Sequence, residues 1–309
     1  MPRAKLAAVE DNLAKVIRGK PAAIRLTLIG MFGGGHVLLE DVPGVGKTTL
    51  AKAIARLLDL DFARIQFTPD LLPSDVVGSP ILNPKEGTLT FQPGPVFTNV
   101  LLADEINRAS PRTQSALLEA MNEEQVSVDG RTKALPSPFF VIATQNPIDF
   151  AGTFPLPEAQ LDRFAVRVSL GYPDEDEEVG MMMDRRTNDP LASLVPVIER
   201  AEVTAILAAV RQVNVHERTA RYVRRIVAKT RELEEIALGA SPRGALALLR
   251  ACQARAYLEG RDHVTAEDAQ ALVPAVLGHR VIATQRARHA GKTTERILQE
   301  AIAGIAVPT

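Results

Sequence analysis

The first half of the chain alternates short apolar runs with longer segments whose apolar residues recur at helical spacing. Five runs have the length and composition of buried strands, and they cover residues 36–40, 61–67, 100–104, 139–144 and 164–169. Segments 6–17, 24–32 and 50–58 are predicted to be helices because their apolar residues fall on one helical face. Strands that are apolar almost throughout and are separated by helices are typical of a parallel sheet covered on both faces. We therefore expect an α/β fold for this half.

Two segments break this rhythm and are predicted to be β-hairpins. In the first, residues 79–82 and 88–91 flank a turn at residues 83–87. In the second, residues 125–128 and 131–134 flank Asp129-Gly130, a pair that tolerates the positive φ angles of a two-residue hairpin turn. Since neither hairpin contributes to a parallel sheet, we expect both to project from it.

Beyond residue 172 the strand patterns fade and helical patterns take over. The predicted helices cover residues 199–213, 219–238, 242–259, 266–277 and 294–302. Thr265 is predicted to be the N-cap of the fourth helix, with Asp268 at the third helical position, where a capping box has its acidic residue. The acidic and proline-containing stretch between the two halves predicts a boundary. We expect a core domain over residues 1–172, a connecting helix or linker over 173–199, and an all-α domain over 200–309.

Composition and charge exclude few classes of function. The chain has 309 residues, of which 36 are Lys or Arg and 37 are Asp or Glu, so it has no overall basic field that would gather nucleic acid. The N-terminus does not resemble a secretory signal, and no stretch approaches the roughly 20 apolar residues that span a bilayer. Cys252 is the only cysteine, and it lies in an apolar helical segment where a buried core residue is expected. We expect a protein of the cytoplasm without a membrane span, and a nucleic-acid partner is not favoured.

Residues 41–48 have the pattern of a phosphate-binding loop, because they lie between a predicted strand and a predicted helix and end in Gly46-Lys47-Thr48. Two glycines allow backbone N–H groups to turn toward phosphate oxygens, helped by the positive end of the following helix. Lys47 would reach the β- and γ-phosphates, and the Thr48 hydroxyl would bind Mg²⁺. Asp41 departs from the general motif, which begins with glycine. The predicted ligands are ATP and Mg²⁺, and the predicted nucleotide-binding residues are Pro43, Gly44, Val45, Gly46, Lys47, Thr48 and Thr49.

Two adjacent carboxylates, Asp104 and Glu105, end the apolar run 100–104. Because the carboxyl ends of parallel strands face the ligand, Asp104 is expected to hold Mg²⁺ directly or through water. Glu105 is placed to orient and deprotonate the attacking water. The next strand is followed by Asn146, whose amide would hold the water or the γ-phosphate. Together with the phosphate-binding loop, these residues predict ATP hydrolysis.

Five motifs occur in an order that resembles AAA+ ATPases and, within them, the MoxR family. The motifs cover residues 38–48, 104–109, 143–147, 156–164 and 241–244, and together they span almost the whole chain. Asp41, unusual for phosphate-binding loops in general, is normal for this family. The resemblance implies a P-loop NTPase sheet with flanking helices, two β-hairpin inserts and a C-terminal helical lid domain.

The resemblance also implies roles for individual residues. Asn146 is similar to the sensor-1 residue, which links the γ-phosphate to the water. Arg163 is similar to the arginine finger, which reaches into the site of a neighbouring subunit. Arg243 resembles the sensor-2 arginine of the lid, and the sequence leaves open whether it acts on its own nucleotide or on a neighbour's. Residues 16–20 resemble a stretch that packs near the adenine, with a slightly different ending. The implied catalytic residues are therefore Glu105, Asn146, Arg163 and Arg243.

The resemblance implies a homo-oligomeric ring, a hexamer, that uses hydrolysis to remodel or mature protein clients. Such clients include von Willebrand factor A domain proteins and proteins with metal cofactors. A second reading is a nucleic-acid-stimulated motor related to replicative helicases. The basic helix around Arg221 and Arg224 favours it, whereas the near-neutral charge and the single interleaved aromatic Tyr222 count against it. A third reading, a nucleotide-gated scaffold with hardly any turnover, would need neither Glu105 nor Arg163.

Overall fold

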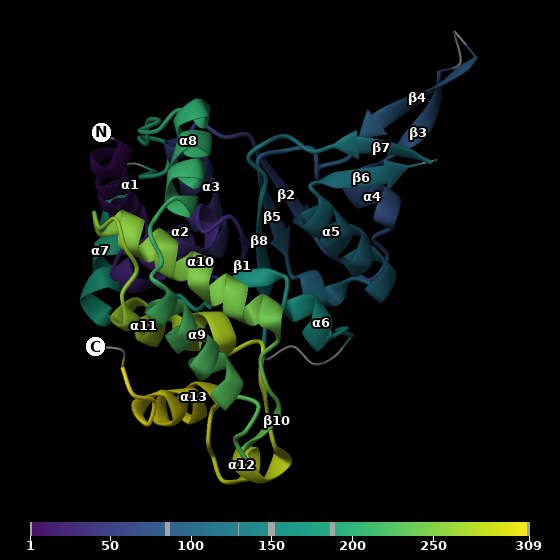
Figure 1. Ribbon diagram of the computed structural model, residues 1–309. Coiled ribbons are helices and arrows are strands. Elements are labelled where there is room, and N and C mark those ends of the chain that lie inside the picture. Colours follow the sequence, from purple (N-terminus) through teal and green to yellow (C-terminus); the bar gives the residue numbers. More distant parts are fainter. Residues whose placement is uncertain (1, 84–86, 129, 148–151, 186–188, 308–309) are drawn as a thin grey trace.

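The computed structural model of this chain (Figure 1) describes residues 2–83, 87–128, 130–147, 152–185 and 189–307. At its centre lies a parallel sheet of five strands in the order β2-β5-β8-β1-β9. The strands are β1 (His36–Glu40), β2 (Phe62–Gln66), β5 (Val100–Asp104), β8 (Phe140–Gln145) and β9 (Phe164–Val168). Each lies within one residue of a run predicted from the apolar pattern, so the predicted parallel sheet is confirmed.

Helices cover both faces of this sheet, as predicted. One face carries α1 (Pro2–Val16), α2 (Pro21–Phe32) and α3 (Lys47–Leu57), and the other carries α4 (Pro73–Val77), the 3₁₀ helix η1 (Ile106–Arg108) and α5 (Pro111–Glu123). Successive strand residues point to opposite faces. In β1, for example, Val37 and Leu39 belong to the core beneath α1–α3, whereas Leu38 belongs to the core beneath α5.

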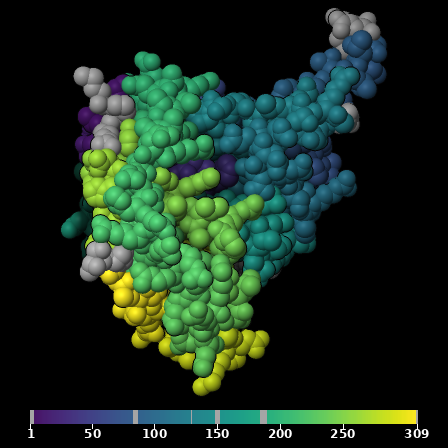
Figure 2. Space-filling view, viewed as in Figure 1, coloured from purple at the N-terminus to yellow at the C-terminus, as the bar shows by residue number. Residues whose placement is uncertain are grey.

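Both predicted hairpins are present outside the parallel sheet. β3 (Gly78–Asn83) pairs with β4 (Thr88–Pro93), and β6 (Gln125–Val128) pairs with β7 (Arg131–Ala134), in each case antiparallel. Their turn residues 84–86 and 129 lie outside the described residues. The β3–β4 hairpin extends well beyond the body of the molecule (Figures 1 and 2). The ammonium of Lys133 on β7 lies 4.5 Å from the centroid of the Phe91 ring on β4, so the two hairpins are in contact near their bases.

The C-terminal region is mostly helical. After α6 (Glu158–Leu161) and α7 (Glu175–Arg185) come α8 (Arg200–Arg211), α9 (Glu217–Lys229), α10 (Pro242–Leu258), α11 (Ala266–Leu277), α12 (Gln285–His289) and α13 (Thr294–Ala303). The predicted cap of α11 is confirmed, because the backbone N–H of Thr265 donates to the Asp268 carboxylate at 2.9 Å. α10 packs against α2, which brings the first residues of α10 close to the sheet.

Two predictions about this region are wrong. The region is not all-α, because β10 (Ile236–Leu238) and β11 (Ile282–Ala283) form a short antiparallel sheet. The helix predicted over residues 219–238 is α9, and it ends at Lys229. Just after that point the Thr230 hydroxyl donates to the Val227 carbonyl at 2.7 Å and accepts from the Ala240 N–H at 2.9 Å. A side chain that competes for backbone groups stops the helix here.

Two simpler expectations are met. Cys252 is buried in α10, and burial raises the pKa of its thiol, as expected for a core residue rather than a nucleophile. Within the described part of the chain, every helix is too short or too polar to span a bilayer.

Candidate active site

The predicted phosphate-binding loop connects the carboxyl end of β1 to the first turn of α3. Gly44 and Gly46 have φ angles of 89° and 99°, a region that side chains disfavour, so glycine is required at both positions. The Gly46 carbonyl accepts the first helical bond of α3 from the Leu50 N–H at 2.9 Å. The loop therefore turns its backbone toward the N-terminal end of α3, where an anion is favoured.

Lys47 lies across the loop rather than extending into solvent. Its ammonium donates to the carbonyl oxygens of Asp41 at 2.7 Å and Val42 at 3.2 Å, and the side chain is buried. Burial lowers the pKa of Lys47, although the nearby carboxylates of Asp41, Asp104 and Glu105 act in the opposite direction. The loop thus holds one cation close to the helix N-terminus, in a position to meet a phosphate.

Asp41, which stands where glycine is usual, has a structural role. One of its carboxylate oxygens accepts from the N–H groups of Leu170 and Gly171, the latter at 3.0 Å, and from the Ser169 hydroxyl at 3.2 Å. These three donors directly follow β9, the strand beside β1. Asp41 therefore connects the start of the loop to the end of the neighbouring strand. A glycine could not do this, because it has no side-chain acceptor.

Asp104 is the last residue of β5 and is buried. One carboxylate oxygen accepts from the Thr144 hydroxyl at 2.7 Å, and the other accepts from the Arg64 guanidinium at 2.6 and 3.1 Å. Thr144 belongs to β8 and Arg64 to β2, the two strands that flank β5. Asp104 is thus held in place from both sides.

Glu105 has a left-handed backbone, with φ 55° and ψ 50°, which is costly for a residue other than glycine. The Thr144 hydroxyl accepts its backbone N–H at 2.8 Å and so supports this conformation. Its carboxylate accepts from Gln66 at 3.0 Å and from Arg108 at 3.1 Å. The turn at Glu105 directs the carboxylate toward β2 and away from the path of β5.

A cleft with a volume of about 350 Å³ joins these elements. It is lined by Pro43, Gly44, Gly46, Lys47, Thr48, Thr49, Arg64, Gln66, Asp104 and Glu105. Val45 has a different position, since it packs against the hydrophobic core. Thr48 and Asp104 both line the cleft and carry side-chain oxygen atoms, the ligands that Mg²⁺ prefers, so these residues fit the ion. The cleft therefore brings together the predicted loop and the predicted carboxylates.

Asn146 lies at the carboxyl end of the central part of the sheet. Asn146 directly follows β8, and β8 lies between β1, which leads into the loop, and β5, which carries Asp104. Ile17 also lies near the loop, because a methyl group built on Gly46 would lie 3.5 Å from its Cδ1 atom. The stretch 16–20 therefore begins beside the phosphate-binding loop.

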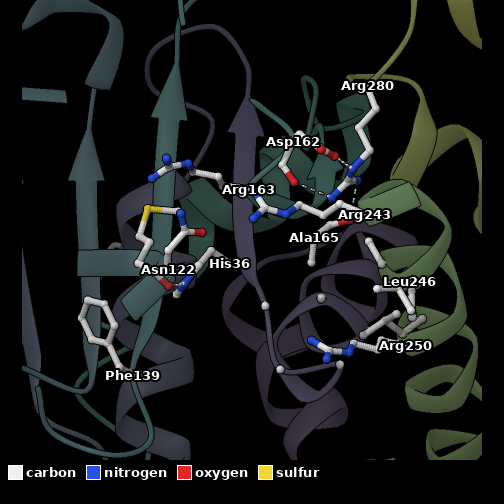
Figure 3. A pocket seen from close by; sticks show the side chains of 18 of the residues that line it. His36, Asn122, Phe139, Asp162, Arg163, Ala165, Arg243, Leu246, Arg250 and Arg280 are labelled. Carbon is white, nitrogen blue, oxygen red and sulfur yellow. Dashed lines mark hydrogen bonds and ion pairs between the residues drawn. The ribbon is translucent and has the colours of Figure 1, made fainter. Parts of the chain in front are cut away.

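Arg163 and Arg243 lie elsewhere, in a pocket at the amino end of the sheet (Figure 3). This pocket has a volume of about 380 Å³, and it is lined by Gly33–Gly35 before β1, Phe139 before β8 and Asp162 before β9. It shares no lining residue with the phosphate-loop cleft. β1 separates the two sites and, at five residues, is about 17 Å long.

Arg163 is half-buried, and its guanidinium is held by hydrogen bonds within its own chain. Its guanidinium donates to the Leu118 carbonyl at 2.5 Å, and it lies 2.9 Å from the Asn122 side-chain oxygen once that amide is turned. Burial and the neighbouring charge of Arg243 both lower the pKa of Arg163. Two cations from different elements, the start of β9 and the start of α10, therefore share one pocket, which favours an anionic ligand.

Comparisons with known proteins agree with this arrangement. Residues 36–166 match the ATPase family associated with various cellular activities (AAA), and residues 228–301 match the AAA lid domain. Over 96% of the chain and 81% of its own length, the chaperone MoxR1 of Mycobacterium tuberculosis is 39% identical. The chain belongs to the MoxR family of AAA+ ATPases. The uncharacterized protein YeaC of Bacillus subtilis is 46% identical over 96% of the chain and 93% of its own length.

A crystal structure extends the similarity to three dimensions. A putative ATPase from Cytophaga hutchinsonii superposes on this MoxR-family protein with a TM-score of 0.92 and 38% identity, covering 100% of the chain and 96% of its own. Both the sheet and the helical lid region are therefore shared with a family relative. The predicted fold class is confirmed.

Several residues of the MoxR-type site were not predicted. Arg64 and Gln66 contact Asp104 and Glu105, and Thr144 contacts both. The alternation of polar Arg64 and Gln66 with apolar Ile65 is a sequence signal, but it points to a site only once β2 is known to lie beside β5. Asp162 and Arg280 were likewise not predicted to matter, although both line the arginine pocket.

Proposed function

We propose that this protein hydrolyses ATP with Mg²⁺ and that each catalytic site is built from two copies of the chain. The observation that carries the proposal is the separation of the two half-sites. Lys47, Asp104 and Glu105 lie at the carboxyl end of the sheet, whereas Arg163 and Arg243 lie at its amino end. Since β1 lies between them, one chain cannot bring its own arginines to its own phosphates.

Within one copy, the loop residues 43–49 bind the triphosphate through backbone N–H groups, and Lys47 neutralises its charge. Thr48 and Asp104 hold the Mg²⁺ ion, which when bound draws negative charge from the phosphate oxygens. Glu105 accepts the proton of the attacking water, and Asn146 orients that water. Thr144 supports both acidic residues, because its hydroxyl donates to the Asp104 carboxylate and accepts from the backbone N–H of Glu105.

The neighbouring copy contributes Arg163 and, by the same geometry, Arg243. Both line one pocket on the far side of the sheet from the loop of their own chain, which supports a role for Arg243 in trans as well. Positive charge placed where negative charge develops lowers the barrier, and an arginine finger accounts for factors of about 10³–10⁵ in kcat. The residues that bind ATP and those that stabilise the transition state would then belong to different subunits.

Copies that complete each other's sites favour a closed homo-oligomeric ring, which we propose to have six subunits and to act in the cytoplasm. We propose a core of residues 1–172, a connection of 173–199 and a lid of 200–309 as its moving parts. The relative MoxR1 is named a chaperone, which supports work on protein clients, including von Willebrand factor A domain and metal-cofactor proteins. The projecting β3–β4 hairpin exposes Ile81, Leu82 and Leu89, apolar side chains suited to contact a client.

A nucleic-acid-stimulated motor is the second candidate. Arg218, Arg221, Arg224 and Arg225 line a groove along α9, which would suit a phosphate backbone. Salt-sensitive stimulation of hydrolysis by single-stranded DNA would favour this candidate, and hydrolysis insensitive to DNA would exclude it. The client-directed function is better supported. Tyr222 is the single aromatic residue of α9, and it is buried, so this helix offers no exposed ring on which a base could stack.

Mixing two inactive variants tests the two-copy site. Lys47→Ala removes the phosphate contact of the loop, and Arg163→Ala removes the finger, so each protein alone is expected to be nearly inactive. In mixed assemblies some intact loops meet intact fingers, and phosphate release should partly return. As a matched control, Arg163→Ala mixed with Arg243→Ala should regain little, because both changes lie on the same face. If the first mixture co-assembles and stays inactive, the two-copy site is refuted.

A further inference from the structure

Arg280 is a buried cation in the lid region, and the proposed mechanism gives it no role. It lies between α11 and β11, and its side chain is only 2% exposed. Burying a guanidinium is costly unless nearly all of its donors are bonded. The bonds that Arg280 makes therefore indicate what its burial accomplishes.

The Arg280 guanidinium joins the lid to the core. Its Nε donates to the Asp162 carboxylate at 2.8 Å. Its two terminal nitrogens donate to the backbone carbonyls of Phe164 at 2.5 Å and Ala165 at 3.1 Å in β9, and to that of Asp162, two residues before β9, at 3.2 Å. A further bond goes back to the Val276 carbonyl of α11. The planar fork of arginine is suited to this task, since lysine cannot supply donors in several fixed directions.

Asp162 extends the same connection to α10. Its second carboxylate oxygen accepts from the Ser241 hydroxyl at 2.8 Å, and that hydroxyl in turn accepts from the Gly244 N–H at 3.2 Å as the N-cap of α10. Arg243 is two residues beyond Ser241, and Arg163 is one residue beyond Asp162. The pair thus contacts the backbone elements that carry both arginines of the pocket. Figure 3 shows Arg280 bonded to Asp162 beside Arg163 and Arg243.

Charge gives the pair a further purpose. Burial lowers the pKa of Arg163 and of Arg280, and the Arg243 charge lowers both further, so Arg243 is close enough to repel each of the other two guanidinium groups. Asp162 compensates the charge of Arg280, which leaves the charges of Arg163 and Arg243 for an anion. Two like charges converge on one ligand only if their supports are fixed, and the bonds of Arg280 and Asp162 provide that support.

We propose that Arg280 and Asp162 are positioning residues for the trans-acting arginines: they lock the start of α10 against the start of β9, so that Arg163 and Arg243 reach the same phosphate of the neighbouring copy. This role rests on the proposed two-copy site. In this role both residues act through Arg163 and Arg243 rather than on the nucleotide. Loss of a purely structural ion pair would lower stability alone. Loss of a positioning pair would lower kcat, and only through the face of the subunit that carries Arg163 and Arg243.

Arg280→Met is the main test, because methionine keeps length and apolar bulk but has no donors. We expect kcat to fall about tenfold to a hundredfold, the usual cost of misplacing a catalytic group by about 1 Å, with KM for ATP within twofold of wild type. Nucleotide binding by the variant's own loop should be unchanged. Arg280→Lys keeps a charge opposite Asp162 and should recover part of kcat.

Subunit mixing distinguishes positioning from general damage. Arg280→Met mixed with Lys47→Ala should regain phosphate release, because the second protein offers intact arginines to the intact loops of the first. Arg280→Met mixed with Arg163→Ala should regain little, because both are defective on the same face. Ser241→Ala offers a milder test of the same connection, with Thr293→Ala as a matched control that removes the N-cap hydroxyl of α13 instead.

Three results would overturn the positioning role while leaving the two-copy site intact. The first is a kcat of Arg280→Met within twofold of wild type. The second is full recovery of phosphate release when Arg280→Met is mixed with Arg163→Ala. The third is an equal effect of Ser241→Ala and Thr293→Ala on kcat. A failure of the parental mixture of Lys47→Ala with Arg163→Ala would instead refute the proposed function, and the positioning role with it. If Arg280→Met does not assemble, the same comparison of Ser241→Ala with Thr293→Ala decides the question.

Discussion

Replacing Thr144 by valine removes one hydroxyl that bonds to both acidic residues of the site, Asp104 through its carboxylate and Glu105 through its backbone N–H. Thr144 is fully buried in β8, and valine has almost the same shape. The hydroxyl donates to Asp104 at 2.7 Å, and a bond to a charged group contributes about 1.5–3 kcal/mol. It also accepts the Glu105 N–H at 2.8 Å, and leaving that donor without a partner costs about 1–3 kcal/mol. The added methyl returns about 1 kcal/mol through apolar burial.

The net expectation is a loss of about 3 kcal/mol in the free energy of unfolding. Urea denaturation at equal protein concentrations measures it, and with a slope near 3 kcal/mol per molar the midpoint should fall by about 1 M. Thr144→Ser is the control, because serine keeps the hydroxyl and loses only a methyl group, at a cost of about 1 kcal/mol. Hydrolysis should also fall in the valine variant, since the left-handed turn at Glu105 loses its support.

The reasoning fails if the valine and serine variants unfold at the same urea concentration. That result would mean that the two hydroxyl bonds contribute nothing beyond the packing of the side chain. It would also remove the structural reason for the unusual backbone of Glu105.

Three further outcomes are expected. Glu105→Gln should bind ATP with unchanged affinity and release phosphate at least a hundredfold more slowly, as single-turnover assays would measure, because the amide cannot accept the water proton. Leu82→Ser combined with Leu89→Ser should leave the free energy of unfolding within about 0.5 kcal/mol of wild type, since both side chains are exposed, and should weaken capture of an unfolded model client; an unchanged capture would exclude the hairpin as the client contact. Burial lowers the pKa of His36 to about 4, so between that value and about 6.5 the unfolded chain binds a proton that the folded chain does not. The free energy of unfolding therefore decreases as the pH is lowered through this window. Urea midpoints at pH 7 and pH 5 should show a loss of about 2 kcal/mol from His36, which His36→Gln should abolish.

The apolar pattern predicted the strands well because each is buried and short. The strand at residues 36–40 and the loop that follows it have local signals, which are an apolar run, two glycines, a lysine and a threonine. The pattern could not reveal that β2 lies beside β5, since strand order is set by packing over the whole sheet. Arg64 and Gln66 therefore remained unnoticed, although they contact the predicted carboxylates.

The extension of α9 past Lys229 was predicted because Leu233 and Ile236 continue its apolar spacing. In the structure Ile236 pairs with Ala283, nearly fifty residues later in the chain, and local periodicity carries no trace of such a partner. The same limit applies to the arginine pocket. Arg163 and Arg243 were identified one at a time from family motifs, whereas their convergence depends on Arg280, which no local motif connects to either.

The placement of the phosphate loop and the arginines at opposite ends of β1 gives the proposed assembly a polarity. Each copy presents its loop to the neighbour on one side and its arginines to the neighbour on the other, so the contacts run head to tail. An open row of such contacts always leaves one loop unmatched, whereas a closed ring matches them all. It also follows that the nucleotide state of one subunit is felt directly by a single adjacent subunit, which makes communication around the assembly one-directional.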